Sequence, residues 1–325
     1  MCGRAGVMVG AVMCVACALG HVLPPPPSSH AHNNRLQAER HHLDDPHYVF
    51  RSELDLPADL QARLQEDHHD PEVTGGFFQG DMAGLTPETV VMNTRVALKW
   101  EAFPEKRWPN ATVPYSISSL YGQNEQQMIR TAITTLQFLT CINFVEWDGK
   151  VEDYLLFWPM KRPRGCWSYV GRRGGMQVVS LQAPDHRSLR CFASLGKPIH
   201  ELLHALGIFH EQARPDRDQH VTILTENIIT EYLGNFRKQS GQNTTFPLPY
   251  DYSSVMHYGS NFFSYTKSVP TIVPKVPGVE IGQRIMLSKL DCLKLNDLYG
   301  CLEDPTDRLK YITFCNFLGI SQLSS

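Results

Sequence analysis

The sequence predicts an α+β domain within a longer chain. Short apolar stretches separated by glycine-containing turns fill residues 144–181, a pattern that is typical of a small sheet with tight turns. Helical spacing of apolar residues and capping signals predict three helices on either side of this region. The 325 residues exceed the usual size of one compact domain, so we expect a main domain with appendages.

Charge is distributed unevenly along the chain. The formal net charge is -3, but residues 1–92 contain 5 basic and 12 acidic residues, whereas the remainder contains 25 basic and 21 acidic residues. An acidic leader therefore precedes a mildly basic body. The chain has no run of Lys and Arg of the kind that binds nucleic acid, so we expect no nucleic-acid partner.

The first twenty residues have the pattern of a secretory signal peptide. Arg4 precedes an apolar run over residues 7–19, and Ala16, Cys17 and Ala18 supply the small residues that signal peptidase needs. The alternative is an N-terminal membrane anchor, but the run is shorter than the roughly 20 residues of a spanning helix. We therefore predict a secreted, extracellular protein without a membrane span.

Cysteine usage agrees with export. Six cysteines follow the predicted signal peptide, and an even number in an exported chain favours disulfides. Two sequons, at Asn110 and Asn243, become candidate glycosylation sites if the chain is exported. The six cysteines are Cys141, Cys166, Cys191, Cys292, Cys301 and Cys315.

Local patterns place the ordered elements after residue 108. Residues 113–117 suit a strand, and Asn124 with Gln127 is expected to open a helix. A second helix is expected at about residues 198–206, and a third at about 288–298 with an S-x-x-D capping pattern. Residues 21–70 are polar and rich in proline and histidine, which predicts a poorly structured extension.

One segment carries the chemistry of the chain. His200 and His204 are one helical turn apart, so both imidazoles can face one ion, with Glu201 beside them. Gly207 can end the helix, which lets His210 approach from another direction. Three histidine ligands with an open fourth position are typical of catalytic zinc. The alternatives are histidines that merely pack in a core, and a structural zinc site with four closing ligands.

The histidine segment and several others together resemble the astacin family of secreted zinc endopeptidases. The histidine spacing is that of the metzincins, and Ser254-Val255-Met256-His257-Tyr258-Gly259 matches the expected Met-turn. The resemblance covers about residues 107–301. It implies a metzincin (zincin-like) catalytic domain of two lobes, with a twisted mixed sheet and helices above and a mostly irregular lower lobe with a C-terminal helix.

The resemblance also assigns roles to individual residues. It implies one zinc ion per chain, Met256 as an apolar floor beneath the metal, and Glu211 as a partner of the new amino terminus after processing. Phe78-Gln79-Gly80-Asp81 resembles the aspartate switch, in which a propeptide carboxylate binds the zinc. The other implied roles are His200, His204 and His210 as zinc ligands, Glu201 as general base, Tyr258 as transition-state donor, Asp81 as zymogen ligand, and the disulfides Cys141–Cys301 and Cys166–Cys191. The pairing of Cys292 and Cys315 stays open.

These observations predict a secreted endopeptidase that is made as a latent proenzyme and hydrolyses proteins or peptides with a zinc-bound water activated by Glu201. We expect an activating protease to cut between Asp81 and Trp108, with Arg95 as one plausible position. The predicted organisation is a signal peptide at 1–20, a propeptide at 21–95, a catalytic domain at 96–302 and a short tail at 303–325. The alternative is a catalytically silent binding or matrix protein that retains the fold. The oligomeric state is not predicted.

Overall fold

The computed structural model describes residues 70–73, 76–85, 103–186, 188–239, 248–266 and 268–320, with no side-chain description for 319 and 320. All of them belong to one compact unit over residues 44–325. The predicted signal peptide, Arg95 and Asn243 lie outside the described residues. Asn110 is described and exposed.

A six-stranded mixed sheet has the strand order β1-β5-β6-β4-β2-β3. Strands β6, β4, β2 and β3 are parallel neighbours, β5 is antiparallel to β6, and β1 pairs in parallel with β5. The short strand β1 comes from the predicted propeptide and covers β5, which would otherwise form the edge of the sheet. The strands are β1 (Met82–Ala83), β2 (Thr112–Ile117), β3 (Asn143–Glu146), β4 (Tyr154–Trp158), β5 (Cys166–Tyr169) and β6 (Met176–Leu181).

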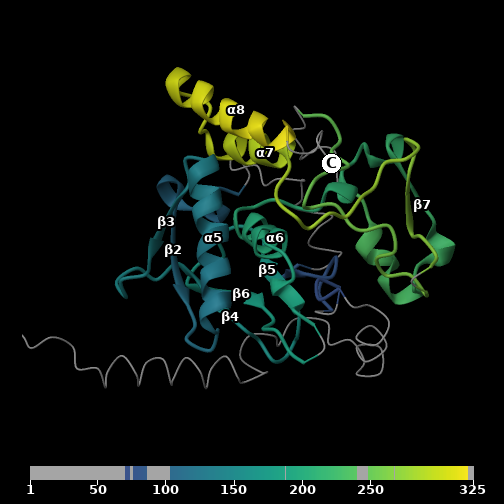
Figure 1. Ribbon diagram of the computed structural model, residues 1–325, viewed down its shortest axis with the longest axis horizontal. Helices are drawn as coiled ribbons and strands as arrows, with labels where there is room; N and C mark the ends of the chain where they lie inside the picture. Colours follow the sequence, from purple (N-terminus) through teal and green to yellow (C-terminus); the bar gives the residue numbers. More distant parts are fainter. Residues whose placement is uncertain are drawn as a thin grey trace, which may run out of the picture. The chain divides into compact units, whose positions relative to one another are not determined.

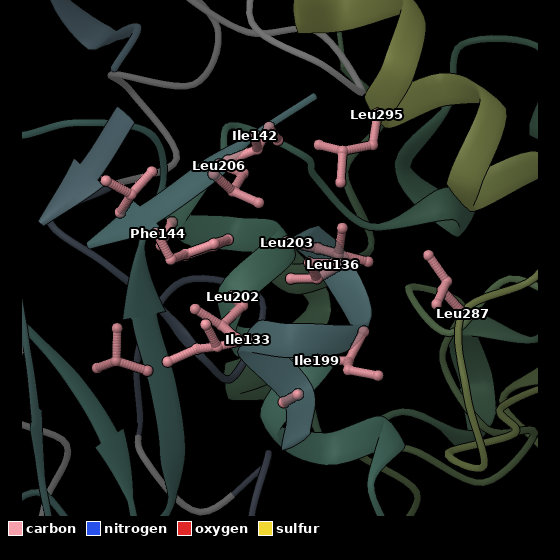
Figure 2. Close-up of a cluster of buried hydrophobic side chains, with 14 of the residues drawn as sticks. Ile133, Leu136, Ile142, Phe144, Ile199, Leu202, Leu203, Leu206, Leu287 and Leu295 are labelled. Carbon is pink, nitrogen blue, oxygen red and sulfur yellow. The ribbon is translucent and has the colours of Figure 1, made fainter. Parts of the chain in front are cut away.

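The main core lies between this sheet and two helices, α5 (Gln123–Leu139) and α6 (Gly196–Ala205). Helix α5 buries one face through apolar residues at helical spacing, whereas every residue of α6 is buried. Figure 2 shows Ile133 and Leu136 of α5 beside Leu202 and Leu203 of α6. Burial on all sides fixes α6, the helix that carries the first two histidines.

The predicted start of α5 was wrong. The N-cap is Gly122 in extended conformation, and the backbone N–H of Gln126 donates to its carbonyl at 3.0 Å. Asn124 lies inside the first turn instead, and no side chain caps this end. Glycine is among the residues found at N-caps, where it costs only a few tenths of a kcal/mol relative to a capping side chain.

The C-terminal helices α7 (Lys289–Tyr299) and α8 (Pro305–Ile320) lie side by side (Figure 1). The capping box of Ser288 and Asp291 is present, as the sequence predicts, and Gly300 ends α7 in the left-handed region at a φ of 75°. A helix in the tail was not predicted. Residues 304–307 nevertheless contain a signal for it, because Asp304 Oδ1 accepts from two backbone N–H groups of the first turn.

The lower lobe is mostly irregular, as the resemblance implies. It contains a two-stranded sheet of β7 (Val221–Ile223) and β8 (Ile272–Pro274), and an aromatic cluster with Tyr232, Phe236 and Phe263 forms its core. Along the whole described chain, the remaining regular elements are short 3₁₀ helices. They are η1 (Pro104–Lys106), η2 (Pro109–Ala111), η3 (Arg190–Phe192), η4 (Glu211–Ala213), η5 (Arg217–Gln219), η6 (Thr225–Asn227) and η7 (Thr230–Phe236).

Three disulfides connect these elements. The structure pairs Cys141 with Cys301 and Cys166 with Cys191, the two pairs that the resemblance implies. It also pairs Cys292 of α7 with Cys315 of α8, which settles the pairing that the sequence left open. Among the described residues, no helix combines the length and apolar character that a bilayer span requires.

Candidate metal centre

The structure brings three histidines together at the end of α6. His200 and His204 lie one turn apart on the helix, and Gly207, at a φ of 97°, turns the chain after it. The N–H of Gly207 donates to the carbonyl of His204 at 2.8 Å, which closes the helix. His210 then approaches from the loop, and the three ring centroids lie 4.7–5.3 Å apart with each ring fully buried.

Hydrogen bonds hold each imidazole in one tautomer. The Nδ1 atoms of His200 and His204 donate to the carbonyls of Val255 and Ile208, both at 2.8 Å. His210 Nδ1 donates to Gln79 Oε1 at 2.9 Å. Burial lowers the pKa of His204 and brings that of His210 to about 3, so these two rings are neutral at pH 7. Because each of the three Nδ1 atoms donates a hydrogen bond, each Nε2 atom is left facing the cluster, which is the arrangement that binds a metal.

The carboxylate of Asp81 lies against the three Nε2 atoms. Its oxygens are 3.1 Å from His200, 3.5 Å from His204 and 3.3 Å from His210. Four ligands bound tetrahedrally at zinc distances stand about 3.3 Å apart, so the spacing fits. His204 Nε2 and Asp81 Oδ1 are also buried without a hydrogen-bond partner, as expected for atoms that bind a metal.

Glu201 lies next to this cluster and is fully buried. Neither of its oxygens has a hydrogen-bond partner among the described residues. Burial raises the pKa of Glu201 well above its usual range, and the negative charges of Asp81 and Glu72 raise it further. Burial therefore favours the protonated form of the carboxyl group, and no other described side chain engages it. Met256, also fully buried, belongs to the main core.

The hydroxyl of Tyr258 contacts the predicted propeptide rather than the cluster. It donates to the carbonyl of Gln79 at 2.6 Å, and its ring centroid lies 4.8 Å from that of His210. Burial raises the pKa of Tyr258, which keeps the hydroxyl protonated and able to donate. Gln79 thus bonds both His210 and Tyr258.

Sequence reasoning missed a second contact that holds the predicted propeptide. The carboxylate of Glu72 is fully buried and accepts from Arg284 Nε at 2.7 and 2.9 Å and from Lys197 Nζ at 3.3 Å. Burial alone would raise the pKa of Glu72, but the two cations hold it well below its usual range. No sequence signal marks this contact, because its partners are 125 and 212 residues away.

Comparison with known proteins identifies the family. Residues 101–300 match the family model named Astacin, which describes a family of peptidases. The chain belongs to the astacin family. It is therefore a zinc metalloproteinase by family, and the ion that suits its three histidines is zinc.

Relatives of this astacin come from distant animals. It is 37% identical over 257 residues to zinc metalloproteinase nas-4 of Caenorhabditis elegans, covering 78% of each chain. It is 42% identical over 201 residues to an astacin-like metalloendopeptidase of Gallus gallus, covering 61% of this chain and 46% of that protein. Several relatives are thus matched over only a third to a half of their length.

A solved relative supports the fold. High choriolytic enzyme 1, a hatching enzyme zinc-protease of the medaka Oryzias latipes, is 38% identical, with a TM-score of 0.53. The match covers 60% of this astacin and 92% of that chain. The two-lobed metzincin fold is therefore confirmed.

Proposed function

We propose that this astacin is a secreted endopeptidase, made as a latent proenzyme, that hydrolyses peptide bonds of protein substrates. The observation that carries the proposal is the position of Asp81 among His200, His204 and His210, with Glu201 unpaired beside them. Three imidazoles and one carboxylate form a complete ligand set for zinc. Removal of the propeptide would take the fourth ligand away and open the site.

After processing, the histidines and Glu201 would have different roles in the reaction. His200, His204 and His210 would hold zinc, whose Lewis acidity lowers the pKa of water and polarises a carbonyl oxygen. Glu201 would accept the proton of the attacking water and pass it to the leaving nitrogen. Its burial without a partner supports this role, because no side chain competes for the proton.

Tyr258 would stabilise the oxyanion. Its hydroxyl already donates to a peptide carbonyl, that of Gln79, so it can reach the carbonyl of a chain bound at this site. A fixed donor near developing negative charge stabilises the transition state. Met256 would act as the apolar floor of the site.

The propeptide would also block the place where a substrate pairs. Strand β1 occupies the free side of β5, and an uncovered sheet edge is a common binding place for an extended peptide. We propose that a protease cuts between Asp81 and Trp108, after which residues 70–85 leave both the edge and the histidines.

The cysteines support secretion. All six cysteines that follow the predicted signal peptide form disulfides in the structure, and disulfides persist in oxidising compartments. Extracellular proteins or peptides are the substrates that such a location implies.

Substitution of Glu201 tests whether the protein is an endopeptidase or a catalytically silent matrix protein with the same fold. In the processed enzyme we expect Glu201→Gln to retain zinc but to lower kcat by about 10²–10⁴, the contribution of a general base. The zinc content of the purified variant tests whether the metal is retained. Cleavage of a peptide library, with and without a chelator, tests the loss of activity. Glu226→Gln, at an exposed position, is the matched control. Unchanged hydrolysis by the Glu201 variant would refute the assignment.

A further inference from the structure

We propose that Gln79 is a positioning residue of the latent metal site, whose side-chain amide holds the imidazole of His210 in the orientation that binds zinc. The inference rests on the proposed function, because Gln79 belongs to the segment that processing would remove. The predicted propeptide would then contribute two groups to the site, the carboxylate of Asp81 on the metal and the amide oxygen of Gln79 behind one of its ligands. Replacing this amide would weaken zinc binding by the uncut chain even though all four ligands remain.

His210 differs from the other two histidines in the partner of its Nδ1 atom. The Nδ1 atoms of His200 and His204 donate to backbone carbonyls at 2.8 Å. Among the described residues, the acceptor that His210 Nδ1 reaches is Gln79 Oε1, at 2.9 Å. His210 also lies on the loop between α6 and η4, so the helix that carries the other two does not set its place. In the uncut chain, the orientation of its ring therefore relies on a side chain from another segment.

The backbone of Gln79 is held on both sides. Its N–H donates to Asn235 Oδ1 at 2.8 Å, and its carbonyl accepts from the Tyr258 hydroxyl at 2.6 Å. Its φ of 52° lies in the left-handed region, which is unfavourable for a residue with a side chain and persists only where the surroundings hold it. Because Gln79 is also buried, its amide has little freedom to leave His210.

Packing alone does not explain the amide group of Gln79. Its Oε1 accepts from His210, but its Nε2 is buried without a hydrogen-bond partner among the described residues. A buried amide donor without a partner costs free energy, and an apolar side chain of the same length would avoid that cost. The hydrogen bond to His210 is the contact that offsets it, which indicates a role at the metal site.

The amide would act on a zinc ligand rather than on the metal itself. An acceptor at Nδ1 fixes the tautomer and the ring orientation of a histidine, and it makes Nε2 a stronger electron donor to the metal. Outer partners of this kind typically contribute about 10–100-fold to metal affinity. Gln79 would therefore strengthen the same latent site that Asp81 closes.

Two substitutions separate the acceptor from the shape of the side chain. Gln79→Met keeps the length but removes the acceptor, whereas Gln79→Glu keeps an acceptor oxygen in the same place. Gln123→Met, at an exposed position of α5, is the matched control. Gln79 precedes every bond between Asp81 and Trp108, so the processed forms of the wild type and of both Gln79 variants have the same sequence. A difference between them must therefore arise in the uncut chain.

Zinc binding by the uncut chains gives the measurement. The zinc dissociation constant is determined by chelator competition, and mass spectrometry verifies that each chain is uncut. Thermal unfolding with and without zinc gives a second readout. The rise in unfolding temperature on adding zinc reports binding to the folded chain, even for a variant that is less stable overall. The kcat/KM of the processed forms is measured on one peptide substrate.

We expect Gln79→Met to weaken zinc binding by the uncut chain about tenfold or more and to reduce the zinc-dependent rise in unfolding temperature. Gln79→Glu and Gln123→Met should stay within about threefold of the wild-type constant. A Gln79→Met chain that binds zinc like the wild type would overturn the inference, as would a Gln79→Glu chain that loses as much affinity as Gln79→Met. If the processed forms cleave no peptide, the proposed function fails, while the zinc constants of the uncut chains still decide the role of Gln79.

Discussion

At the residue scale, the three imidazoles depend on partners of different origin. His200 and His204 bond backbone carbonyls of the catalytic body, at Val255 and Ile208. His210 bonds the side chain of Gln79, which belongs to the predicted propeptide. Processing would therefore remove one outer partner of the metal site together with the carboxylate of Asp81.

In the proposed function, latency depends most on Asp81. We expect Asp81→Ala in the uncut proenzyme to raise peptide hydrolysis at least about tenfold over the wild-type proenzyme, because the fourth zinc position opens. Asp148→Ala, which removes an exposed carboxylate, should leave the uncut protein silent. A fluorogenic peptide assay measures the hydrolysis, and mass spectrometry verifies that the chain is still uncut. A silent Asp81 variant would contradict the switch.

The residues of the site differ in how far the sequence could predict them. Local spacing was enough for His200, Glu201 and His204, because a single helical turn brings them together. Tyr258 and Asp81 became candidates only through the family resemblance. Glu72 could not be predicted, because buried ion pairs between residues so far apart in the chain leave no periodic pattern.

At the element scale, two contacts hold the described residues of the segment 70–85, one before and one after Asp81 in the sequence. Strand β1 pairs with β5, and Glu72 is buried against Arg284 and Lys197. The chain comes so close between them that a Cβ on Gly80 would lie 2.7 Å from the carbonyl of Glu72 and 3.1 Å from Phe263. The predicted propeptide is thus held by more contacts than that of Asp81 with the histidines.

Weakening the contacts of Glu72 should make the proenzyme easier to activate. We expect Glu72→Gln to speed activation by a fixed amount of activating protease several-fold, because a neutral amide removes the carboxylate that pairs with the buried Arg284 and one of the two that pair with Lys197. Asp70→Asn is the control, since Asp70 is partly exposed and its ion pair among the described residues is with Lys197, at 2.7 Å, and not with Arg284. The rate of appearance of peptidase activity measures the effect. Equal rates for the two variants would argue against this role of Glu72.

The helices show why elements were predicted unevenly. Helix α7 begins where the capping box indicates, because that signal is local and both of its hydrogen bonds form. Helix α8 was missed although Asp304 and Pro305 mark its start, because its apolar residues do not form one buried stripe. Leu309 and Phe317 are exposed, whereas Tyr311 and Cys315 are buried.

The Cys292–Cys315 disulfide should matter for stability rather than for catalysis. The two cysteines are 23 residues apart, and closing a loop of that length stabilises a fold by roughly 3 kcal/mol in the chain-entropy model. We expect the double variant Cys292→Ser with Cys315→Ser to unfold at a lower temperature while the processed enzyme keeps its kcat. Calorimetry and a peptide assay test this. An unchanged unfolding temperature would refute it.

At the scale of the whole molecule, one chain contains both the proposed metal site and the segment that we propose inhibits it. The main core fixes α6 with two histidines, the ring of Tyr258 lies beside the third, and Asp81 places a carboxylate among them. The sequence predicted this fold class because its strands, helices and turns have local signals. It could not show how the predicted propeptide contacts the site.

The coordination of zinc in the purified, uncut proenzyme tests the central claim most directly. X-ray absorption at the zinc edge should find one zinc per chain with three imidazole nitrogens and one carboxylate oxygen at about 2.0–2.2 Å. In the Asp81→Ala proenzyme, the spectrum should retain three imidazoles and lose the carboxylate. A proenzyme without stoichiometric zinc, or one whose zinc spectrum does not change when Asp81 is replaced, would contradict the proposed latent metal centre.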